Sequence, residues 1–244
     1  MPRDKAANFD LLARVYAPLE RFSFGRALER RRACFLADSR VANARRVLVL
    51  GDGDGRFTAA LLERYPALEV SAVDASAAML GELQRRVRQH CCQAALTVHH
   101  ADLRVWSPPQ HCSPRRGSRI AFDLVATHFF FDCFTSHEIQ AIVARVAPTL
   151  TPDARWLVSD FAIPSGGARA LAARLLVRVL YFAFWAVTGL HVKRLADYRS
   201  ALTSAGFACM RVENALGGVL RSELWQRSDA SPTSQASRRG PLEQ

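Results

Sequence analysis

The feature that most constrains the fold is an apolar run leading directly into closely spaced glycines, the segment VLVLGDGDGRF at residues 47–57. Gly51, Gly53 and Gly55 follow a strand-like pattern, and a helical pattern begins at about Phe57. Glycines at such a point allow a tight turn and let the backbone approach a ligand beyond the carboxyl end of a sheet. The segment therefore predicts a strand, a ligand-binding turn and a helix in succession.

The same alternation continues along the chain. Strand patterns occupy Arg46–Leu50, Leu68–Asp74, Ala95–His100, Ile120–Thr127 and Arg155–Asp160, and helical patterns occupy Phe57–Tyr65, Ala77–Gln89, Ser136–Leu150 and Leu195–Ala205. Strands separated by helices predict βαβ units and a parallel sheet that is covered on both faces, so the fold class is α/β and doubly wound. Two later strand-like runs, Ala208–Asn214 and Val219–Gln226, meet across Gly217 and Gly218 and predict a hairpin.

At 244 residues the chain fits one main domain. We expect an N-terminal helical lid segment at residues 1–40, the domain at 41–227 with a cap insertion at about 164–205, and a disordered tail at 228–244, which is rich in Ser, Pro and charge. The apolar stretch at 175–190 is shorter than the roughly 20 residues that cross a bilayer, so we interpret it as a cap helix over an acceptor pocket. Peripheral membrane contact is the alternative.

The charge and the cysteines exclude several kinds of site. The formal net charge is +11, but nearly all basic residues are Arg and they are spread along the chain, which makes nucleic-acid binding an unlikely function. The six cysteines contain no C-x-x-C pair, so we predict no metal site. The N-terminal MPRDKAANFD lacks the apolar core of a signal peptide, which predicts a cytoplasmic protein. The oligomeric state is left open.

Asp74 indicates what kind of ligand the glycine turn binds. It ends the second strand about 20 residues after the turn, where a carboxylate can accept hydrogen bonds from ribose hydroxyls. A dinucleotide site with the pattern G-x-G-x-x-G/A needs a small third residue, but counting from Gly51 that position is Arg56. The observed G-x-G-x-G spacing favours a nucleoside cofactor without a pyrophosphate.

With these motifs, the sequence resembles class I S-adenosylmethionine-dependent methyltransferases over about residues 45–226. The matching segments are VLVLGDGDG, VDASAAML, HADLRVW and FDLVATHFFF. The resemblance implies a seven-stranded Rossmann-like sheet whose last strand is antiparallel, and the cofactor S-adenosyl-L-methionine. The cofactor-binding residues it implies are Gly51, Asp52, Gly53, Gly55, Asp74, Ala75, Asp102, Leu103 and Thr127.

Individual roles follow from the resemblance. Asp102 is expected to bond the exocyclic amine of adenine, with Leu103 beside the ring. Many members carry Asp or Glu two residues before the first glycine, where this sequence has Val49. Asp52 is the residue that we expect to contact the amino-acid part of the cofactor instead.

The methyl acceptor is expected beyond the fourth strand, beside the sulfonium of the cofactor. His128 is the candidate base because the ordinary pKa of histidine lies near neutrality, with Asp132 or His137 as partner or substitute. A hydrogen-bonded structural histidine is the alternative for His128. The phenylalanines at 129–131 either line an apolar acceptor pocket or belong to the core.

The N-terminal FDLLARVYAPLERFSFG resembles the entry segment of methyltransferases that act on ubiquinone and menaquinone precursors, with Tyr16 as a cofactor-lid residue. Together with the apolar cap, this predicts a small, apolar or quinone- or lipid-like acceptor. The preferred function is therefore a small-molecule methyltransferase. Two alternatives stay open: a non-catalytic Rossmann-like binding module and an NAD-dependent oxidoreductase.

Overall fold

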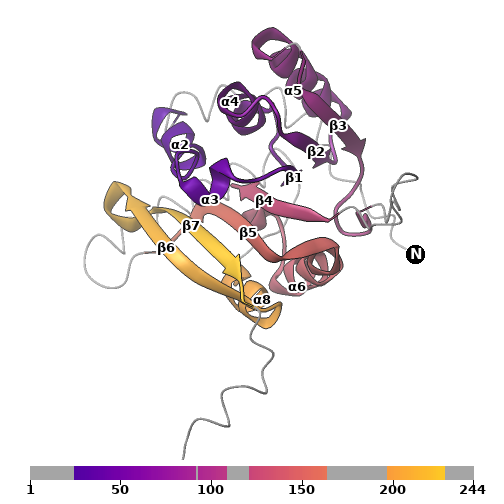
Figure 1. Cartoon of the computed structure of the whole chain (residues 1–244). Coiled ribbons are helices and arrows are strands. Elements are labelled where there is room, and N and C mark those ends of the chain that lie inside the picture. Colours follow the sequence, from indigo (N-terminus) through magenta and orange to yellow (C-terminus); the bar gives the residue numbers. More distant parts are fainter. Residues whose placement is uncertain (1–24, 92, 109–120, 164–196, 229–244) are drawn as a thin grey trace, which may run out of the picture.

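The computed structural model describes residues 25–91, 93–108, 121–163 and 197–228, which form one sheet with helices on both faces (Figure 1). Several features predicted from the sequence fall outside these ranges. They are most of the lid segment, including Tyr16, the loop at 109–120, the cap insertion up to residue 196 with its apolar stretch, and the tail after residue 228.

The sheet contains seven strands in the order β3-β2-β1-β4-β5-β7-β6. Their bounds are β1 Arg46–Leu50, β2 Glu69–Asp74, β3 Ala95–His100, β4 Phe122–His128, β5 Leu150–Phe161, β6 Phe207–Ala215 and β7 Leu220–Arg227. The first five strands are parallel, and β7 lies between β5 and β6, antiparallel to both. The predicted doubly wound fold, the antiparallel last strand and the closing hairpin are therefore confirmed.

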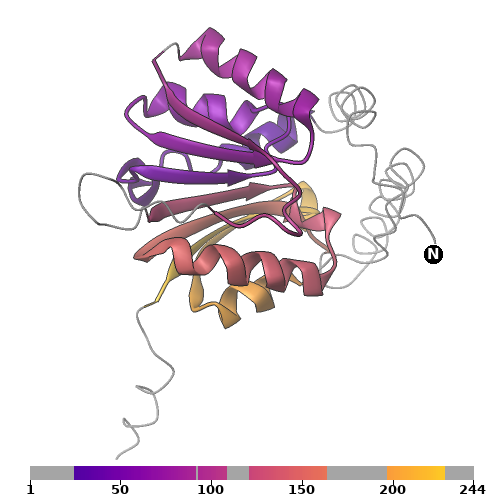
Figure 2. The same ribbon diagram turned by 90° about the vertical axis from the view of Figure 1, so that its right-hand side faces the viewer.

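Two helical layers cover the sheet (Figures 1 and 2). The helices are α2 Gly25–Arg32, α3 Ser39–Ala42, α4 Arg56–Arg64, α5 Ala77–His90, α6 Ser136–Val146 and α8 Tyr198–Ser204, and the short 3-10 helices are η1 Phe131–Cys133, η2 Ala147–Thr149 and η3 Leu216–Gly218. The helices α2 to α5 lie over one face of the sheet, which we call the α4 face. The helices α6 and α8 lie over the other, the α6 face.

The two faces bury alternate residues of the central strands. In β1, Leu48 and Leu50 belong to the core under α6, whereas Val47 and Val49 belong to the core under α4. This division follows from the two-residue period of a strand, and it explains why the strand segments read as continuous apolar runs. The same alternation places consecutive residues at the end of β4 on opposite faces.

The helices begin where the sequence supplies caps. Ser76 Oγ accepts a hydrogen bond from Met79 N at the start of α5, and Thr135 and Glu138 form a reciprocal capping box at the start of α6. The helix predicted up to residue 150 ends instead at Val146, because Pro148 cannot continue the α-helical ladder. The fifth strand correspondingly begins earlier than predicted, at Leu150.

Candidate functional site

The glycine turn adopts the left-handed backbone that the motif predicts. Gly51, Gly53 and Gly55 have φ of 67°, 59° and 78°, a region that residues with a side chain rarely occupy. Two of these glycines also permit close packing. A Cβ at Gly51 would lie 2.2 Å from Cδ2 of Phe130, and a Cβ at Gly55 would lie 2.5 Å from Cγ of Leu83 on α5. The turn thus follows the carboxyl end of β1 and is pressed against its neighbours.

Asp74 and the glycine turn meet at this edge of the sheet. Asp74 Oδ2 accepts a hydrogen bond from Gly53 N at 3.2 Å, and Oδ1 accepts one from Ser76 N at 2.9 Å. The pKa of Asp74 is raised, because the effect of burial outweighs that of the backbone N–H donors, which lower it. The carboxylate is only partly buried and each of its oxygens has a further lone pair, so it retains capacity to accept ribose hydroxyls. Ala75 follows it, and its carbonyl oxygen is 3.1 Å from His100 Nε2.

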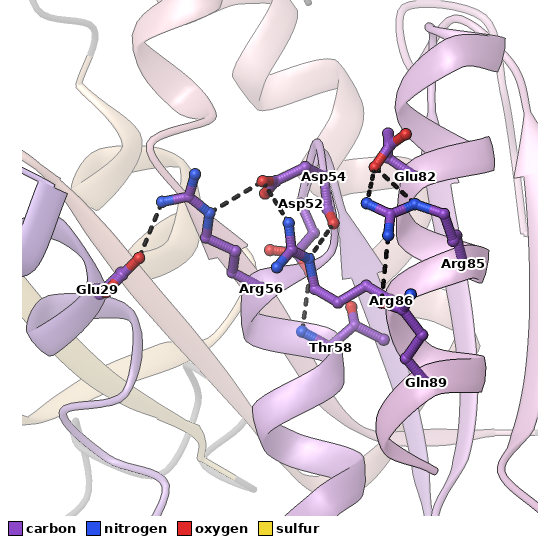
Figure 3. A network of polar contacts seen from close by, with 9 residues as sticks. All are labelled: Glu29, Asp52, Asp54, Arg56, Thr58, Glu82, Arg85, Arg86 and Gln89. Atoms are coloured by element: carbon purple, nitrogen blue, oxygen red, sulfur yellow. Dashed lines mark hydrogen bonds and ion pairs between the residues drawn. The ribbon is translucent and has the colours of Figure 1, made fainter. Parts of the chain in front are cut away.

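Asp54 ties the turn to three helices (Figure 3). Its Oδ2 accepts hydrogen bonds from Arg56 Nε and Arg86 Nη2, both at 2.9 Å, and Arg86 Nε donates to the Asp54 carbonyl at 2.9 Å. Arg56 Nη1 donates in turn to Glu29 Oε1 on α2 at 2.9 Å. These side chains are largely shielded from water, except for Glu29. The sequence analysis missed this network, because no spacing rule connects Asp54 with Arg86.

Asp52 points inward beneath the turn (Figure 3). Its Oδ2 accepts a hydrogen bond from Thr58 N at 2.8 Å, which satisfies one free N–H in the first turn of α4. Within the described part of the chain, Asp52 Oδ1 and Thr58 Oγ1 are buried and have no hydrogen-bond partner. Burial raises the pKa of Asp52 to about 6. An inward carboxylate oxygen with free lone pairs suits a cationic ligand group.

His128 ends β4 on the α4 face. It is 5% exposed, and its ring lies 4.3 Å from the ring of Phe57, centroid to centroid. Neither ring nitrogen has a hydrogen-bond partner among the described residues, so the alternative of a hydrogen-bonded structural histidine finds no support there. Burial, together with the nearby guanidinium of Arg32, lowers the pKa of His128 to about 3. The imidazole is therefore neutral near pH 7.

Asp132 lies beyond the end of β4, after the turn at Phe129. It belongs to η1, and its Oδ1 accepts a weak hydrogen bond from Cys133 Sγ at 3.5 Å. Burial raises the pKa of Asp132 to about 6. The structure does not bring His128 and Asp132 together as a pair. His137, the other substitute, is exposed in the first turn of α6.

Asp160 is a further acidic residue at this edge that the sequence analysis did not single out. It lies next to the end of β5 and is 2% exposed. Burial and the nearby charge of Asp132 raise its pKa well above the ordinary value. Its position near the end of a parallel strand, like that of Asp74, was the available signal, since such ends meet at one edge of the sheet.

Asp102 and Leu103 follow β3 and differ in exposure. The Asp102 side chain is 46% exposed, and its Oδ1 accepts a hydrogen bond from Arg104 N at 2.9 Å. Arg104 Nε also donates to Glu138 Oε1 at 2.7 Å, which joins this turn to α6. Leu103 is buried in the core under α6. The Asp102 carboxylate is thus exposed at the β3 end of the edge.

The residues at the end of β4 have different surroundings: some pack in the core, and others shape or cover the turns at this edge. Thr127 is buried, and its Oγ1 donates to the Leu157 carbonyl at 3.2 Å and accepts from Trp156 Nε1 at 3.1 Å. Phe129 has a φ of 52°, unusual for a residue with a side chain, and redirects the chain away from the sheet. Phe130 covers Gly51, whereas Phe131 stacks with Tyr198 in the core. Each phenylalanine therefore has its own surroundings, and Phe131 is a core residue.

Two features bear on metals and membranes. In the portion of the chain that the structure describes, His, Cys, Asp and Glu nowhere form a group of three that is arranged to hold a metal ion. No helix within that same portion has the length and apolarity needed to cross a membrane.

Known proteins share this architecture. Residues 48–156 match a family model described as a methyltransferase domain. A trans-aconitate 2-methyltransferase from Delftia acidovorans is 33% identical over 116 residues, which is 46% of this chain and 38% of the relative. The match therefore spans less than half the length of this relative.

Solved structures with similar folds cover most of the chain. An S-adenosylmethionine-dependent methyltransferase, SibL, is 18% identical with a TM-score of 0.62 over 89% of this chain and 58% of its own. Magnesium protoporphyrin IX methyltransferase from Synechocystis PCC 6803, solved with bound SAH, is 19% identical with a TM-score of 0.60 over 90% of this chain and 94% of its own. An O-methyltransferase family 2 protein from Planctomyces limnophilus, solved with apigenin, is 17% identical with a TM-score of 0.61 over 92% of this chain and 66% of its own.

The resemblance inferred from the sequence is confirmed at two levels. The described chain has the seven-stranded fold of class I S-adenosylmethionine-dependent methyltransferases, and residues 48–156 match the model of a methyltransferase domain.

Proposed function

We propose that this protein binds S-adenosyl-L-methionine and transfers its methyl group to a small molecule. The observation that carries the proposal is the hydrogen bond from Gly53 N to Asp74 Oδ2, which joins the glycine turn and the ribose-binding carboxylate at one edge of the sheet. The methyltransferase-domain match over residues 48–156 and the bound SAH in the Synechocystis relative support the same cofactor.

Three acidic residues lie along this edge of the sheet in the same order as the adenine, the ribose and the amino-acid end of the cofactor. Asp102 follows β3, Asp74 ends β2 and Asp52 follows β1, and these strands are neighbours in the order β3-β2-β1. In our proposal Asp102 bonds the adenine amine, Asp74 the ribose hydroxyls and Asp52 the ammonium of the amino-acid end. The methyl group would then lie at β4, the next strand in the sheet.

The proposed chemistry needs orientation, exclusion of water and, for some acceptors, a base. When bound, S-adenosylmethionine supplies an electrophilic methyl group on a cationic sulfur. The chain contributes by holding the acceptor in line with that methyl group. A histidine with a pKa of about 3 is a weak base, so we assign His128 to the wall of the amino-acid end and proton acceptance to Asp132.

For the acceptor we propose a small, largely apolar molecule. Apolar side chains lie at the β4 end of the edge: Phe129 is partly exposed there and lies 5.4 Å from Phe161, centroid to centroid. The Planctomyces relative was solved with apigenin, a small molecule. The narrower expectation of a quinone- or lipid-like acceptor rests on the N-terminal segment and the cap, which lie outside the described residues. Peripheral membrane contact rests on those segments too.

Calorimetric titration with S-adenosylmethionine, S-adenosylhomocysteine and NAD side by side tests the cofactor. We expect heat from the first two, and an affinity at least about tenfold lower for Asp74→Asn, since a hydrogen bond to a charged group contributes about 1.5–3 kcal/mol. Asp123→Asn is the matched control, because Asp123 likewise accepts two backbone hydrogen bonds, from Arg45 N at 2.8 Å and Arg46 N at 3.1 Å, at the opposite edge.

The outcomes separate the three candidate functions. Binding of NAD alone would support the oxidoreductase. Cofactor binding without transfer of an isotopically labelled methyl group to any component of a metabolite extract would support a binding module. An unchanged affinity in Asp74→Asn would contradict the proposed site.

A further inference from the structure

Asp160 is a buried carboxylic acid that the reaction proposed above does not use. It is 2% exposed, and its Oδ1 accepts a hydrogen bond from Phe161 N at 2.8 Å. The backbone N–H of Asp132 also bonds this carboxyl group. Since Asp132 follows β4 and Asp160 lies near the end of β5, the adjacent strands place the two residues side by side, and the Asp160 carboxyl group is close enough to sense the charge of Asp132. Asp160 thus lies beside the residue to which we assign proton acceptance.

The charged and titratable groups that face this pair come from several elements. They are Asp132 and Cys133 of η1, Glu223 and Arg221 of β7, Tyr198 of α8 and, through Cys133, Asp74 of β2. Glu223 has its own partners: its Oε1 is 3.4 Å from Arg199 Nε and 3.9 Å from Arg221 Nη1, and its Oε2 accepts a hydrogen bond from Trp225 Nε1 at 2.9 Å. The arginines therefore balance Glu223.

Asp132 and Asp160 lack that balance. Among the residues that the structure describes, neither carboxyl group forms an ion pair. Asp160 is buried and Asp132 is partly buried, so little water separates their negative charges. Two adjacent carboxyl groups in such surroundings cannot both ionise cheaply, so one of them holds a proton. The raised pKa of both groups agrees with this expectation.

We propose that Asp132 and Asp160 share one proton and act as a unit, in which Asp132 accepts the proton lost by the methyl acceptor and Asp160 positions Asp132. This inference rests on the proposed methyl transfer. In the step, the acceptor oxygen or nitrogen takes the methyl group as the sulfur–carbon bond breaks, and its proton passes to the Asp132 carboxylate. The pair then holds two protons, one of which returns to solvent after the products leave.

The pair also selects the chemical class of acceptor. A molecule that reacts through a carboxylate has no proton to lose and would bring further negative charge beside Asp132 and Asp160. A neutral hydroxyl or amine has the proton and adds no like charge. The inference therefore assigns neutral hydroxyl or amine compounds to this chain, in contrast to trans-aconitate, the acid named for the Delftia relative.

Urea unfolding between pH 6.5 and 8 tests the shared proton, because Asp52 with its pKa of about 6 has largely ionised by then. The folded pair holds a proton that the unfolded chain has lost, so stability is present at low pH and falls as pH rises towards the raised pKa. The unfolding constant of the wild type relative to Asp160→Asn should rise about tenfold per pH unit. The unfolding constant of the wild type relative to Asp123→Asn should instead stay constant over this pH range, because that control variant keeps the pair and the proton contributes equally to both proteins.

Infrared spectroscopy checks the same point in the folded protein. The wild type at pH 7 should show the carbonyl stretch of a protonated carboxyl group, and Asp160→Asn should lose it. A ratio of unfolding constants that does not change with pH, or a band that persists in Asp160→Asn, would overturn the shared proton.

The acceptor class has a separate test with two kinds of probe. Labelled S-adenosylmethionine is incubated with trans-aconitate and with a set of neutral phenols and aromatic amines. Transfer of label to a phenol or amine supports the assigned class of acceptor. The positioning role is supported if Asp160→Asn lowers kcat for that acceptor more than it changes KM and shifts the pH profile of the rate. A labelled trans-aconitate ester, or an unchanged pH profile in Asp160→Asn, refutes it. Failure to bind S-adenosylmethionine in calorimetry would instead contradict the proposed function, while the unfolding and infrared results still report on the pair.

Discussion

Gly55→Ala isolates the packing that the glycine turn makes possible. Gly55 precedes α4 with φ of 78°, and a Cβ there would lie 2.5 Å from Leu83 Cγ and 2.7 Å from Leu83 Cα on α5. The Cα belongs to the backbone of a helix, so it cannot move aside as the end of a flexible side chain can. The substitution must therefore strain the turn and push α4 and α5 apart.

Two terms set the expected size of the loss. The left-handed backbone costs a residue with a side chain about 1–2 kcal/mol, and inserting a methyl group into a packed contact costs about 1–3 kcal/mol more. The sum, about 2–5 kcal/mol, is a large part of the stability of a typical domain. Gly206→Ala supplies the control, because Gly206 has φ of 85° but nothing lies within 4 Å of its added Cβ.

Urea unfolding followed by tryptophan fluorescence measures both variants at one pH. We expect Gly206→Ala to lose only the conformational term, and Gly55→Ala to lose about 1–3 kcal/mol beyond it. The slope of the unfolding free energy against urea should stay unchanged in both. Equal losses in the two variants would refute the argument that Gly55 is required by the packing of α4 against α5.

Three further predictions concern buried polar groups. His128 has a pKa of about 3 in the folded protein and an ordinary value of 6.5, so its contribution to stability is lost as pH falls below 6.5. When the pH is lowered from 6.5 to 4.5, the free energy of unfolding measured in urea titrations should fall by about 2–3 kcal/mol less in His128→Leu than in the wild type. If Asp52, with its pKa of about 6, receives the cofactor ammonium, calorimetry at pH 6 in buffers of different ionisation enthalpy should show proton release on binding, which Asp52→Asn abolishes. Arg86→Met removes both hydrogen bonds to Asp54 and should cost about 1–2 kcal/mol, whereas Arg85→Met, which removes only contacts of an exposed side chain, should leave the melting temperature nearly unchanged.

The sequence by itself determined the features that depend on local geometry. The glycines of the turn were predictable because only glycine readily adopts φ near +60° to +80°, and all three observed values lie there. The strands and helices were predictable from their periods, and the hairpin from Gly217 and Gly218. Asp74 was predictable because its distance along the chain from the turn matches one βα unit. The end of α6 was predicted four residues too late, because the helical pattern continues to residue 150 but Pro148 ends the α-helix at Val146.

Only the tertiary structure decided which distant side chains meet and how far water is excluded from them. Asp132 and Asp160 are 28 positions apart in the numbering and become neighbours because β4 and β5 are adjacent in the sheet. His128 and Asp132 are close in sequence, yet they have different neighbours: His128 contacts Phe57, whereas the chain turns at Phe129 and Asp132 lies beside Asp160. The pKa of a carboxyl group or an imidazole depends on such neighbours and on burial, which are properties of the packed molecule and not of the order of its residues.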